Sequence, residues 1–131
     1  MPSRRDFLAT VTAAAVLPIR PATLRTGPHP TPRRGITASK VATTEQLAGK
    51  PEAIQIFELV REIPAVVDGI RCQCGCMDGK DYYSLLSCFE TPDMMASQCL
   101  ICQAQARLVH RLHKAGKTLD EIRRGVDARF G

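Results

Sequence analysis

The chain contains no tryptophan, and its 131 residues include only two tyrosines and four phenylalanines. The core of a folded domain must therefore be built mainly from aliphatic side chains. We recognise no serine–histidine triad, no glycine-rich phosphate loop and no pair of acid–base carboxylates. The residues therefore support neither hydrolysis nor phosphoryl transfer, and the length suits one small domain.

The C-terminal two thirds of the chain also lack an excess of positive charge, although the formal net charge is +5. Residues 1–43 carry seven Lys and Arg side chains against one acidic side chain, whereas residues 44–131 carry eleven against twelve. A nucleic-acid-binding domain is expected to carry a basic patch on its folded surface. The distribution of charge therefore excludes nucleic acid as a partner.

No hydrophobic run is long enough to span a bilayer. The uncharged stretch over residues 7–19 is too short for this and fits the apolar region of a signal peptide. It overlaps the string S-R-R-D-F-L at residues 3–8, which resembles the signal read by the twin-arginine translocase. An ordinary secretory signal is the alternative. The first cysteine is Cys72, so no lipid-anchor cysteine is present. We expect residues 1–22 to direct export to the periplasm or the extracytoplasmic face, with membrane contact only through an uncleaved leader.

Proline is concentrated ahead of the helical part of the sequence. Five of the nine prolines lie in residues 18–40, among basic and small residues. Such a composition cannot bury a core and is typical of a disordered or polyproline-like linker. We therefore expect a linker over residues 23–43, in which His29 has no specific role, followed by a helical six-cysteine domain over residues 44–131.

No segment predicts a strand, and the pattern from Thr44 onward is helical. Pro51 suits a first helical position, and Pro64 should end or kink the helix that begins there. Between the two prolines lies an apolar stripe made of Ile54, Phe57, Leu59 and Val60. A short second segment over residues 65–68 leads into the cysteine loop, and a short helix is expected over residues 81–89.

A longer helix is expected from about Ala96, and Gly116 supplies its end. Its apolar residues recur at helical spacing and are Leu100, Ile101, Ala104, Leu108, Val109 and Leu112. Residues 118–121 form a T-x-x-E capping box, which opens a last helix with an apolar face made of Leu119, Ile122, Val126 and Phe130. We predict an all-α fold, a small helical bundle or hairpin with a cysteine-rich loop packed against it.

All the cysteines lie within 31 residues of one another. A domain of this size buries only about 60% of the surface that its unfolded chain exposes, and small scaffolds usually need disulfides, a metal or a partner. The cysteines therefore have a structural role under almost any hypothesis. They are Cys72, Cys74, Cys76, Cys88, Cys99 and Cys102.

Three of the cysteines alternate in the stretch I-R-C-Q-C-G-C-M-D-G, residues 70–79. In an extended chain, alternate side chains point the same way, so the three sulfurs would lie about 6–7 Å apart on one face. Gly75 lets the loop curl until the thiolates converge on one ion. A disulfide within C-x-C would be strained. If the thiols are oxidised, we expect each loop cysteine to pair with one of Cys88, Cys99 and Cys102.

Cys99 and Cys102 form a C-x-x-C in the first turns of the predicted long helix. Free N–H groups and the helix dipole favour the thiolate there, which is the form that binds metals and attacks disulfides. Soft sulfur ligands select Cu(I), Zn(II) or iron–sulfur clusters. Zinc would use four sulfurs and a Cu(I) cluster all six, whereas the spacings do not match the ferredoxin-type runs. All six cysteines are therefore candidate ligands of a copper or zinc ion.

The stretch from Ile63 to the C-terminus resembles the bacterial PCYCGC-motif family of small exported cysteine-rich proteins. The resemblance covers about half of the chain and includes all six cysteines in order, with C-Q-C-G-C at residues 72–76. Arg71 stands where that family has its name-giving proline and Gln73 where it has tyrosine, and neither change removes a sulfur. Since the family has little assigned function, the resemblance implies an exported thiol-rich protein and names no ligand. A weaker similarity of the C-terminal end to the helical thiol domain of cytochrome c maturation proteins implies a helical fold, and redox chemistry by analogy.

Other potential ligands surround the cysteines in the sequence. His110 and His113 share the predicted helix with the C-x-x-C. Each lies eleven residues after one of its two cysteines, a rise of about 16 Å along the helix, so we expect both histidines at the surface. Three thioethers and three carboxylates remain, Met77, Met94, Met95, Asp78, Asp81 and Asp93. We expect the methionines to fill the core, although a thioether suits Cu(I), and the aspartates to lie in turns and helix caps.

Three hypotheses follow. The first, which we prefer, is a non-enzymatic protein that binds copper or zinc through clustered thiolates. The second is a disulfide-stapled structural or interaction domain, which an oxidising compartment would favour. The third is a thiol–disulfide oxidoreductase that uses Cys99 and Cys102, although no redox fold is recognisable.

Overall fold

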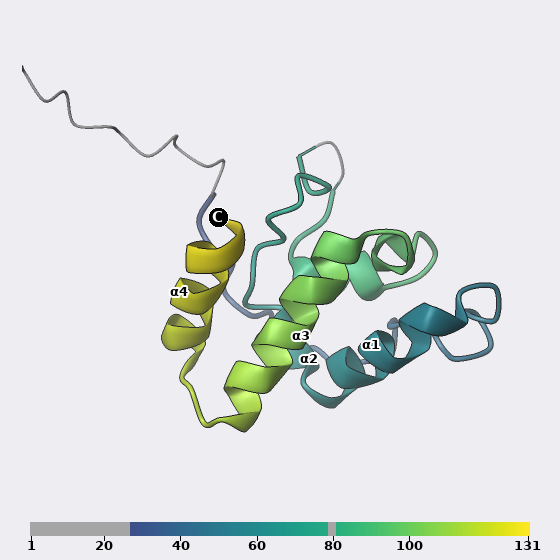
Figure 1. Cartoon of the computed structure of the whole chain (residues 1–131), viewed down its shortest axis with the longest axis horizontal. Coiled ribbons are helices and arrows are strands. Elements are labelled where there is room, and N and C mark those ends of the chain that lie inside the picture. The colour runs from purple at the N-terminus through teal and green to yellow at the C-terminus, as the bar shows by residue number, and fades with distance from the viewer. Residues whose placement is uncertain (1–26, 79–80) are drawn as a thin grey trace, which may run out of the picture.

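The computed structural model describes residues 27–78 and 81–131, and its regular elements in this part of the chain are all helical. The only β pairing among these residues is an isolated bridge between Val41 and Glu90. The predicted all-α fold is therefore confirmed (Figure 1). The signal segment predicted over residues 1–22 lies outside the described residues. The elements are the α-helices α1 (Pro51–Glu62), α2 (Pro64–Val67), α3 (Leu100–Lys114) and α4 (Leu119–Phe130), and the 3-10 helices η1 (Leu85–Phe89) and η2 (Met95–Ser97).

Two prolines set the limits of the first helices, as the sequence predicts. Pro51 is the first residue of α1, where its missing N–H leaves no helical hydrogen bond unmade. Pro64 cannot continue α1 because it lacks a donor and its ring clashes with the preceding turn. The chain turns at Ile63 and starts the four-residue helix α2 at Pro64. Both helices thus begin at a proline.

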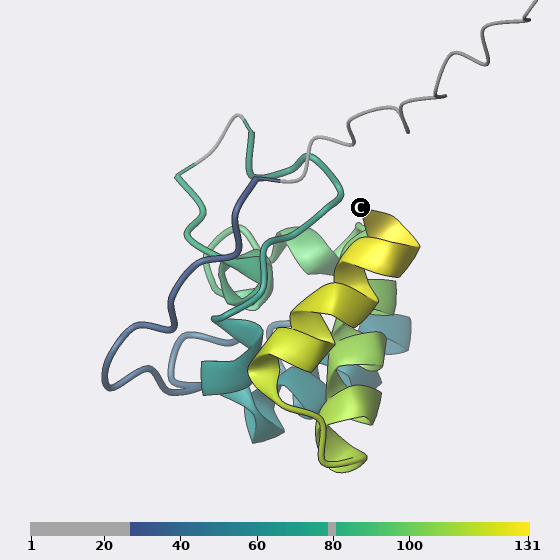
Figure 2. The ribbon, with the colours of Figure 1, turned by 90° about the vertical axis from the view of Figure 1, so that its left-hand side faces the viewer.

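α3 and α4 form an antiparallel hairpin at the C-terminal end (Figure 2). Gly116 follows α3 with a φ of +82°, the left-handed conformation that glycine adopts without strain. Thr118 Oγ1 then accepts the backbone N–H of Glu121 at 3.2 Å, and Glu121 Oε1 accepts the N–H of Thr118 at 3.1 Å. The predicted capping box is therefore confirmed, and it fixes where α4 starts.

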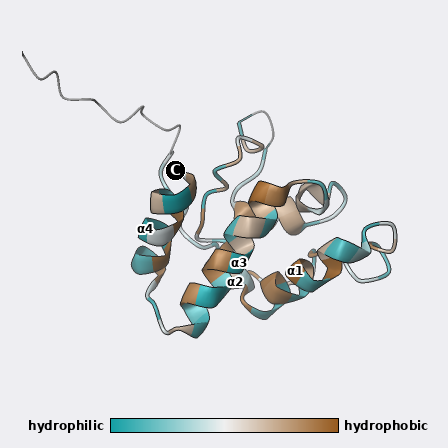
Figure 3. Ribbon diagram, viewed as in Figure 1, coloured by the Kyte–Doolittle hydropathy of each residue, from teal (hydrophilic) through white to brown (hydrophobic). Residues whose placement is uncertain are grey.

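The core lies between α1, α3 and the segments that connect them, and α3 packs against both α1 and α4. Phe57 of α1 and Phe89 of η1 are fully buried and meet edge to face, with their ring centroids 4.8 Å apart. Most other core side chains are aliphatic, as the scarcity of aromatic residues requires. Polar and apolar residues alternate around the helices (Figure 3), as expected when each helix buries one side. No helix among the described residues is long and apolar enough to cross a membrane.

The prediction of a helix over residues 81–89 is wrong in its first half. Residues 81–84 are not helical, and only η1 follows. Ser84 is extended because its hydroxyl donates to the buried carboxylate of Asp68 at 2.7 Å, while the N–H of Leu85 donates to Ile70 O at 2.7 Å. These tertiary hydrogen bonds outweigh the local helical pattern.

The predicted start of the long helix and part of its apolar face are also wrong. The short helix η2 covers residues 95–97, and α3 begins only at Leu100. Leu100 and Ile101 are 78% and 47% exposed. They point outward because Cys102, on the same turn, occupies the buried side of the helix. Apolar spacing alone could not show that a cysteine takes the inner position.

The predicted linker is wrong for residues 27–43, which pack against the helical domain. Val41 and Ala42 are buried, and Ala42 N donates to Phe89 O at 3.1 Å. Arg33 donates to Asp68 through its backbone N–H at 2.8 Å and through its side chain at 2.8 and 3.2 Å. Burial by itself would raise the pKa of Asp68, but the hydrogen bonds from Arg33 and Ser84 hold it below its ordinary value. The folded unit therefore begins before residue 44.

Candidate metal centre

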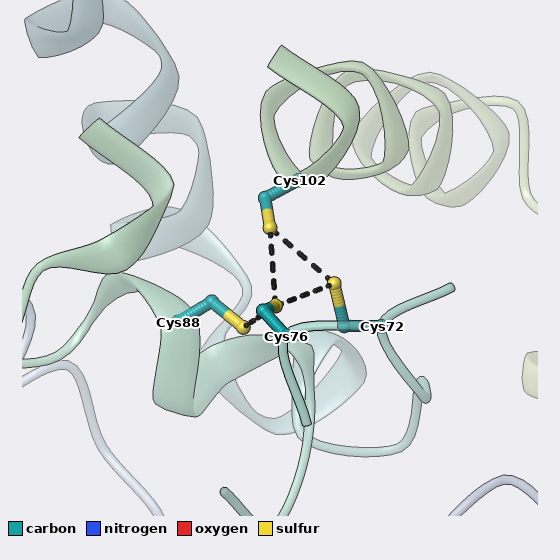
Figure 4. Close-up of side chains that lie close together, drawn as sticks. All are labelled: Cys72, Cys76, Cys88 and Cys102. Atoms are coloured by element: carbon teal, nitrogen blue, oxygen red, sulfur yellow. Dashed lines mark hydrogen bonds between the residues drawn. The ribbon is translucent and has the colours of Figure 1, made fainter. Parts of the chain in front are cut away.

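Six sulfur atoms meet where three separate segments of the chain come together. The loop after Ile70 supplies Cys72, Cys74 and Cys76, the helix η1 supplies Cys88, and the start of α3 supplies Cys99 and Cys102. All six are free thiols. Figure 4 shows Cys102 pointing from α3 toward Cys72 and Cys76, with Cys88 on the other side of Cys76.

The loop is curled rather than extended, and this brings its three sulfurs together. Gly75 has a φ of +81°, and Asp78 N donates to Gly75 O at 3.1 Å, which closes a turn. Cys72 Sγ consequently lies 3.0 Å from Cys74 Sγ and 3.5 Å from Cys76 Sγ. The expected role of Gly75 in curling the loop is confirmed, and an extended arrangement is excluded.

Cys102 lies at the centre of the cluster. Its Sγ atom is 3.3 Å from Cys72 Sγ, 3.4 Å from Cys74 Sγ and 3.7 Å from Cys76 Sγ. Cys88 Sγ lies 3.5 Å from Cys76 Sγ. The sulfurs of the cysteine loop and those at the start of α3 therefore lie in one region, as the sequence predicts.

The start of α3 is shaped by Cys99. This residue is the N-cap, and its Sγ atom accepts the backbone N–H of Cys102 at 3.3 Å. The C-x-x-C thus places one thiol at the cap and the other on the first turn, close to the positive end of the helix dipole.

The thiols do not ionise independently. The pKa of Cys76 lies far below its ordinary value because neighbouring thiols donate hydrogen bonds to its thiolate, with the largest contribution from Cys102. The pKa of Cys102 is raised, first by its hydrogen bond with Cys72, because Cys102 keeps its proton and donates it. Without a cation, one thiolate is stabilised at the expense of its neighbours. A bound cation would stabilise several thiolates at once.

The sulfur positions fit a soft metal ion. The sulfurs of Cys72, Cys76, Cys88 and Cys102 all lie within 4.8 Å of one another, and so do those of Cys74, Cys99 and Cys102. Four sulfurs around a zinc ion at about 2.3 Å stand about 3.8 Å apart. Within the set of four, the contacts of 3.3–3.7 Å are close to this spacing. The geometry thus matches a metal–thiolate site without identifying the metal.

Hydrogen bonds outside the sulfurs hold the loop in place. Arg71 N donates to His29 Nδ1 at 2.9 Å, and His29 Nε2 lies 2.9 Å from Asp127 of α4. Gln73 N donates to Oε1 of the fully buried Gln105 at 3.2 Å, and Gln73 Nε2 donates to Asp127 at 3.1 Å. The expectation that His29 has no specific role is therefore wrong. Its ring joins the N-terminal segment, the cysteine loop and α4.

These supporting residues were missed because the signal for them is tertiary. His29 lies in a proline-rich stretch whose composition indicates a linker, and nothing nearby in the sequence marks its partners. Gln105 falls three residues after Cys102, which is the same side of an α-helix. That spacing was the one available sign that a polar side chain would face the cluster.

The other candidate ligands lie elsewhere or have other partners. His110 Nε2 pairs with Glu62 at 2.9 Å, about two turns of α3 beyond Cys102. Asp78 pairs with Arg71 at 3.0 Å. Met77 is the exception, because its sulfur accepts the backbone N–H of Cys72 at 3.2 Å and so supports the loop. Asp93 accepts the hydroxyl of Tyr82 at 2.8 Å.

Comparisons of the chain with protein-family models, with curated proteins and with solved structures find no significant match. The relationship to the PCYCGC-motif family therefore stays a prediction. The site is interpreted from its own geometry, which is that of a cysteine cluster able to hold a metal ion.

Proposed function

We propose that this is an exported small protein that binds a soft metal ion, copper or zinc, through clustered thiolates. The observation that carries the proposal is the convergence of sulfurs from three separate segments to distances of 3.3–3.7 Å. Thiolate sulfur is a preferred ligand of both Cu(I) and Zn(II). No carboxylate or imidazole group joins the two sulfur sets in the described part of the chain.

A bound metal would also stabilise this small domain, whose core alone is expected to give only marginal stability. The cysteines join the loop, η1 and α3, which otherwise meet through a small aliphatic core. A structural metal converts its binding free energy into folding free energy when the unfolded chain has no site. Six buried or half-buried thiols without a cation leave like charges close together on ionisation. We infer that the ion completes the fold at this end of α3.

Export follows from the N-terminal sequence, which resembles a twin-arginine signal. That route carries proteins across the membrane in a folded state, so the thiols can be loaded in the reducing cytosol before they reach an oxidising compartment. The resemblance to the PCYCGC-motif family agrees with an exported thiol-rich protein. We propose on these grounds a periplasmic or extracytoplasmic location.

The test is to purify the protein without chelator under anaerobic conditions and to measure bound metal and reactive thiols in the same sample. We expect stoichiometric copper or zinc, and thiols that react fully only after chelation. His110→Ala is the matched control, because His110 pairs with Glu62 away from the sulfurs, and it should keep the full metal content.

Two other results would contradict the proposed function, and each would support one of the other two hypotheses. Protein without metal and without titratable thiols would show a disulfide-stapled domain. Metal-free protein in which Cys99 and Cys102 exchange rapidly with glutathione would show a thiol–disulfide oxidoreductase. The contacts of Cys102 with three sulfurs of the loop argue against the oxidoreductase, because Cys102 is not reserved for Cys99.

A further inference from the structure

The six sulfurs fall into two sets that share one member. Cys72, Cys76, Cys88 and Cys102 form a group of four, and Cys74, Cys99 and Cys102 form a group of three. Within each group all the sulfur atoms lie within 4.8 Å of one another. Cys102 alone belongs to both, and the groups also touch where Cys74 Sγ lies 3.0 Å from Cys72 Sγ. A thiolate sulfur has several lone pairs, so one thiolate can bind two soft ions at once.

The two sets differ in their access to solvent. In the set of four, Cys72, Cys88 and Cys102 are buried and only Cys76 is half-buried. In the set of three, Cys74 and Cys99 are both half-buried, and Cys102 alone is buried. The set of four is therefore an inner subsite, and the set of three is an outer subsite at the surface.

The two sulfurs that belong only to the outer subsite each accept a backbone hydrogen bond. Cys74 Sγ accepts the backbone N–H of Cys76 at 3.4 Å, and Cys99 Sγ accepts that of Cys102 at 3.3 Å. Both sulfurs found only in the outer subsite are therefore held in place by backbone hydrogen bonds. The exposed side chains of Leu100 and Ile101, which directly follow Cys99, form an apolar surface next to the outer subsite.

We infer that the cluster holds two soft ions bridged by the thiolate of Cys102, and that the outer ion, Cu(I), is the one exchanged with external thiols. This inference rests on the proposed function. Three sulfurs satisfy Cu(I), whereas Zn(II) in a closed site takes four ligands, so the outer subsite suits Cu(I). The inner subsite offers four sulfurs, three of them buried, so its ion is retained.

Exchange at the outer subsite is a ligand substitution without electron transfer. An incoming thiol releases its proton to solvent and forms a sulfur–copper bond. The bond from Cys99 or Cys74 to copper breaks, and the released thiolate takes up a proton. Copper stays Cu(I) throughout, and charge and protons balance. The half-buried position of Cys99 allows the approach that the buried Cys72 and Cys88 exclude.

The experiment is an anaerobic titration of the full chain with Cu(I), followed by native mass spectrometry and then by competition with a Cu(I) chelator. We expect two ions per chain and two phases of removal, the first at least tenfold faster. Cys99→Ser should bind one ion and lose the fast phase. Serine is itself a preferred N-cap, so this variant keeps the start of α3.

Two further variants complete the test. Cys88→Ser, its matched control, should keep the fast-exchanging ion and weaken the slow one. Cys102→Ser should lose the two-ion form, with circular dichroism to show that the helices remain. One ion per chain in the unchanged protein, or two ions in Cys99→Ser, would overturn the two-subsite inference and leave the proposed function standing. No bound ion in any form would overturn both.

Discussion

The Sγ atoms of Cys72 and Cys102 lie 3.3 Å apart although 30 positions separate the two residues in the sequence. The contact joins the cysteine loop to the first turn of α3, and both side chains are buried. No covalent bond holds this contact, because both residues are free thiols. The stability of this end of the molecule is therefore expected to depend on what the sulfurs bind.

Removing the metal should lower the stability of the whole domain. A ligand at about 1,000 times its dissociation constant stabilises the folded state by about 4 kcal/mol, and 1 kcal/mol shifts the unfolding temperature of a domain this size by about 4–8 °C. We therefore expect a strong thiol-competing chelator to lower the midpoint by about 15 °C or more, measured by circular dichroism. A variant with all six cysteines changed to serine should not respond to the chelator. An equal midpoint with and without chelator in the unchanged protein would contradict this prediction.

Acid should release the metal from the same site. Protons compete with metal ions for thiolates, so metal affinity falls as the pH falls. We expect the metal content after gel filtration to decrease between neutral pH and about pH 4, and the thiols to become reactive in the same range. Metal retained in full at about pH 4 would contradict this prediction.

Asp68→Asn should destabilise the protein through the contact that holds residues 27–43 to the domain. Asp68 is fully buried and accepts hydrogen bonds from Arg33 and Ser84. Arg33 is 39% exposed, so its charge remains partly solvated after the change, and we expect a loss of about 2 kcal/mol in urea unfolding. Asp120→Asn is the matched control, because Asp120 is 77% exposed in its pair with Arg123. It should change stability by less than about 0.5 kcal/mol.

The effect of Asp68→Asn should also depend on pH. The pKa of Asp68 is lower in the folded protein than its ordinary value of about 3.8. Its contribution is therefore fully present above about pH 4 and is lost as the pH falls through the folded pKa. The difference in unfolding free energy between the two proteins should shrink below about pH 4. A difference that grows with acidity would mean that the buried carboxyl is protonated at neutral pH.

The helices and the cysteine cluster were predictable because their signals are local. Pro51, Pro64, Gly116 and the capping box at Thr118 fix helix ends by backbone chemistry, and alternating cysteines around Gly75 indicate a curled loop. The packing of residues 27–43 and the extended backbone at Ser84 depend on Asp68, which no local pattern links to Arg33. Likewise, the division of the sulfurs into two sets depends on which side of α3 faces the loop.

Gly116→Ala should destabilise the hairpin between α3 and α4. Gly116 has a φ of +82°, and no side chain or backbone atom lies within 4 Å of the position that a Cβ would take. The cost is therefore conformational rather than steric, and we expect about 1 kcal/mol. Gly49→Ala is the control, since Gly49 also has open space around it but no left-handed φ. It should leave the urea midpoint unchanged or slightly higher, and an equal loss in both variants would contradict this account.

His29→Ala should loosen the cysteine loop without removing a sulfur. The change leaves the N–H of Arg71 without its acceptor and removes the link to Asp127, and we expect a loss of about 1–2 kcal/mol. Because Arg71 directly precedes Cys72, metal should also leave the variant faster during competition with a chelator, although its metal content at saturation stays normal. His113→Ala is the matched control, since His113 lies near the C-terminal end of α3, away from the sulfurs. Equal release rates in the unchanged protein and both variants, with stability lost only in His29→Ala, would show that His29 holds the N-terminal segment and not the loop.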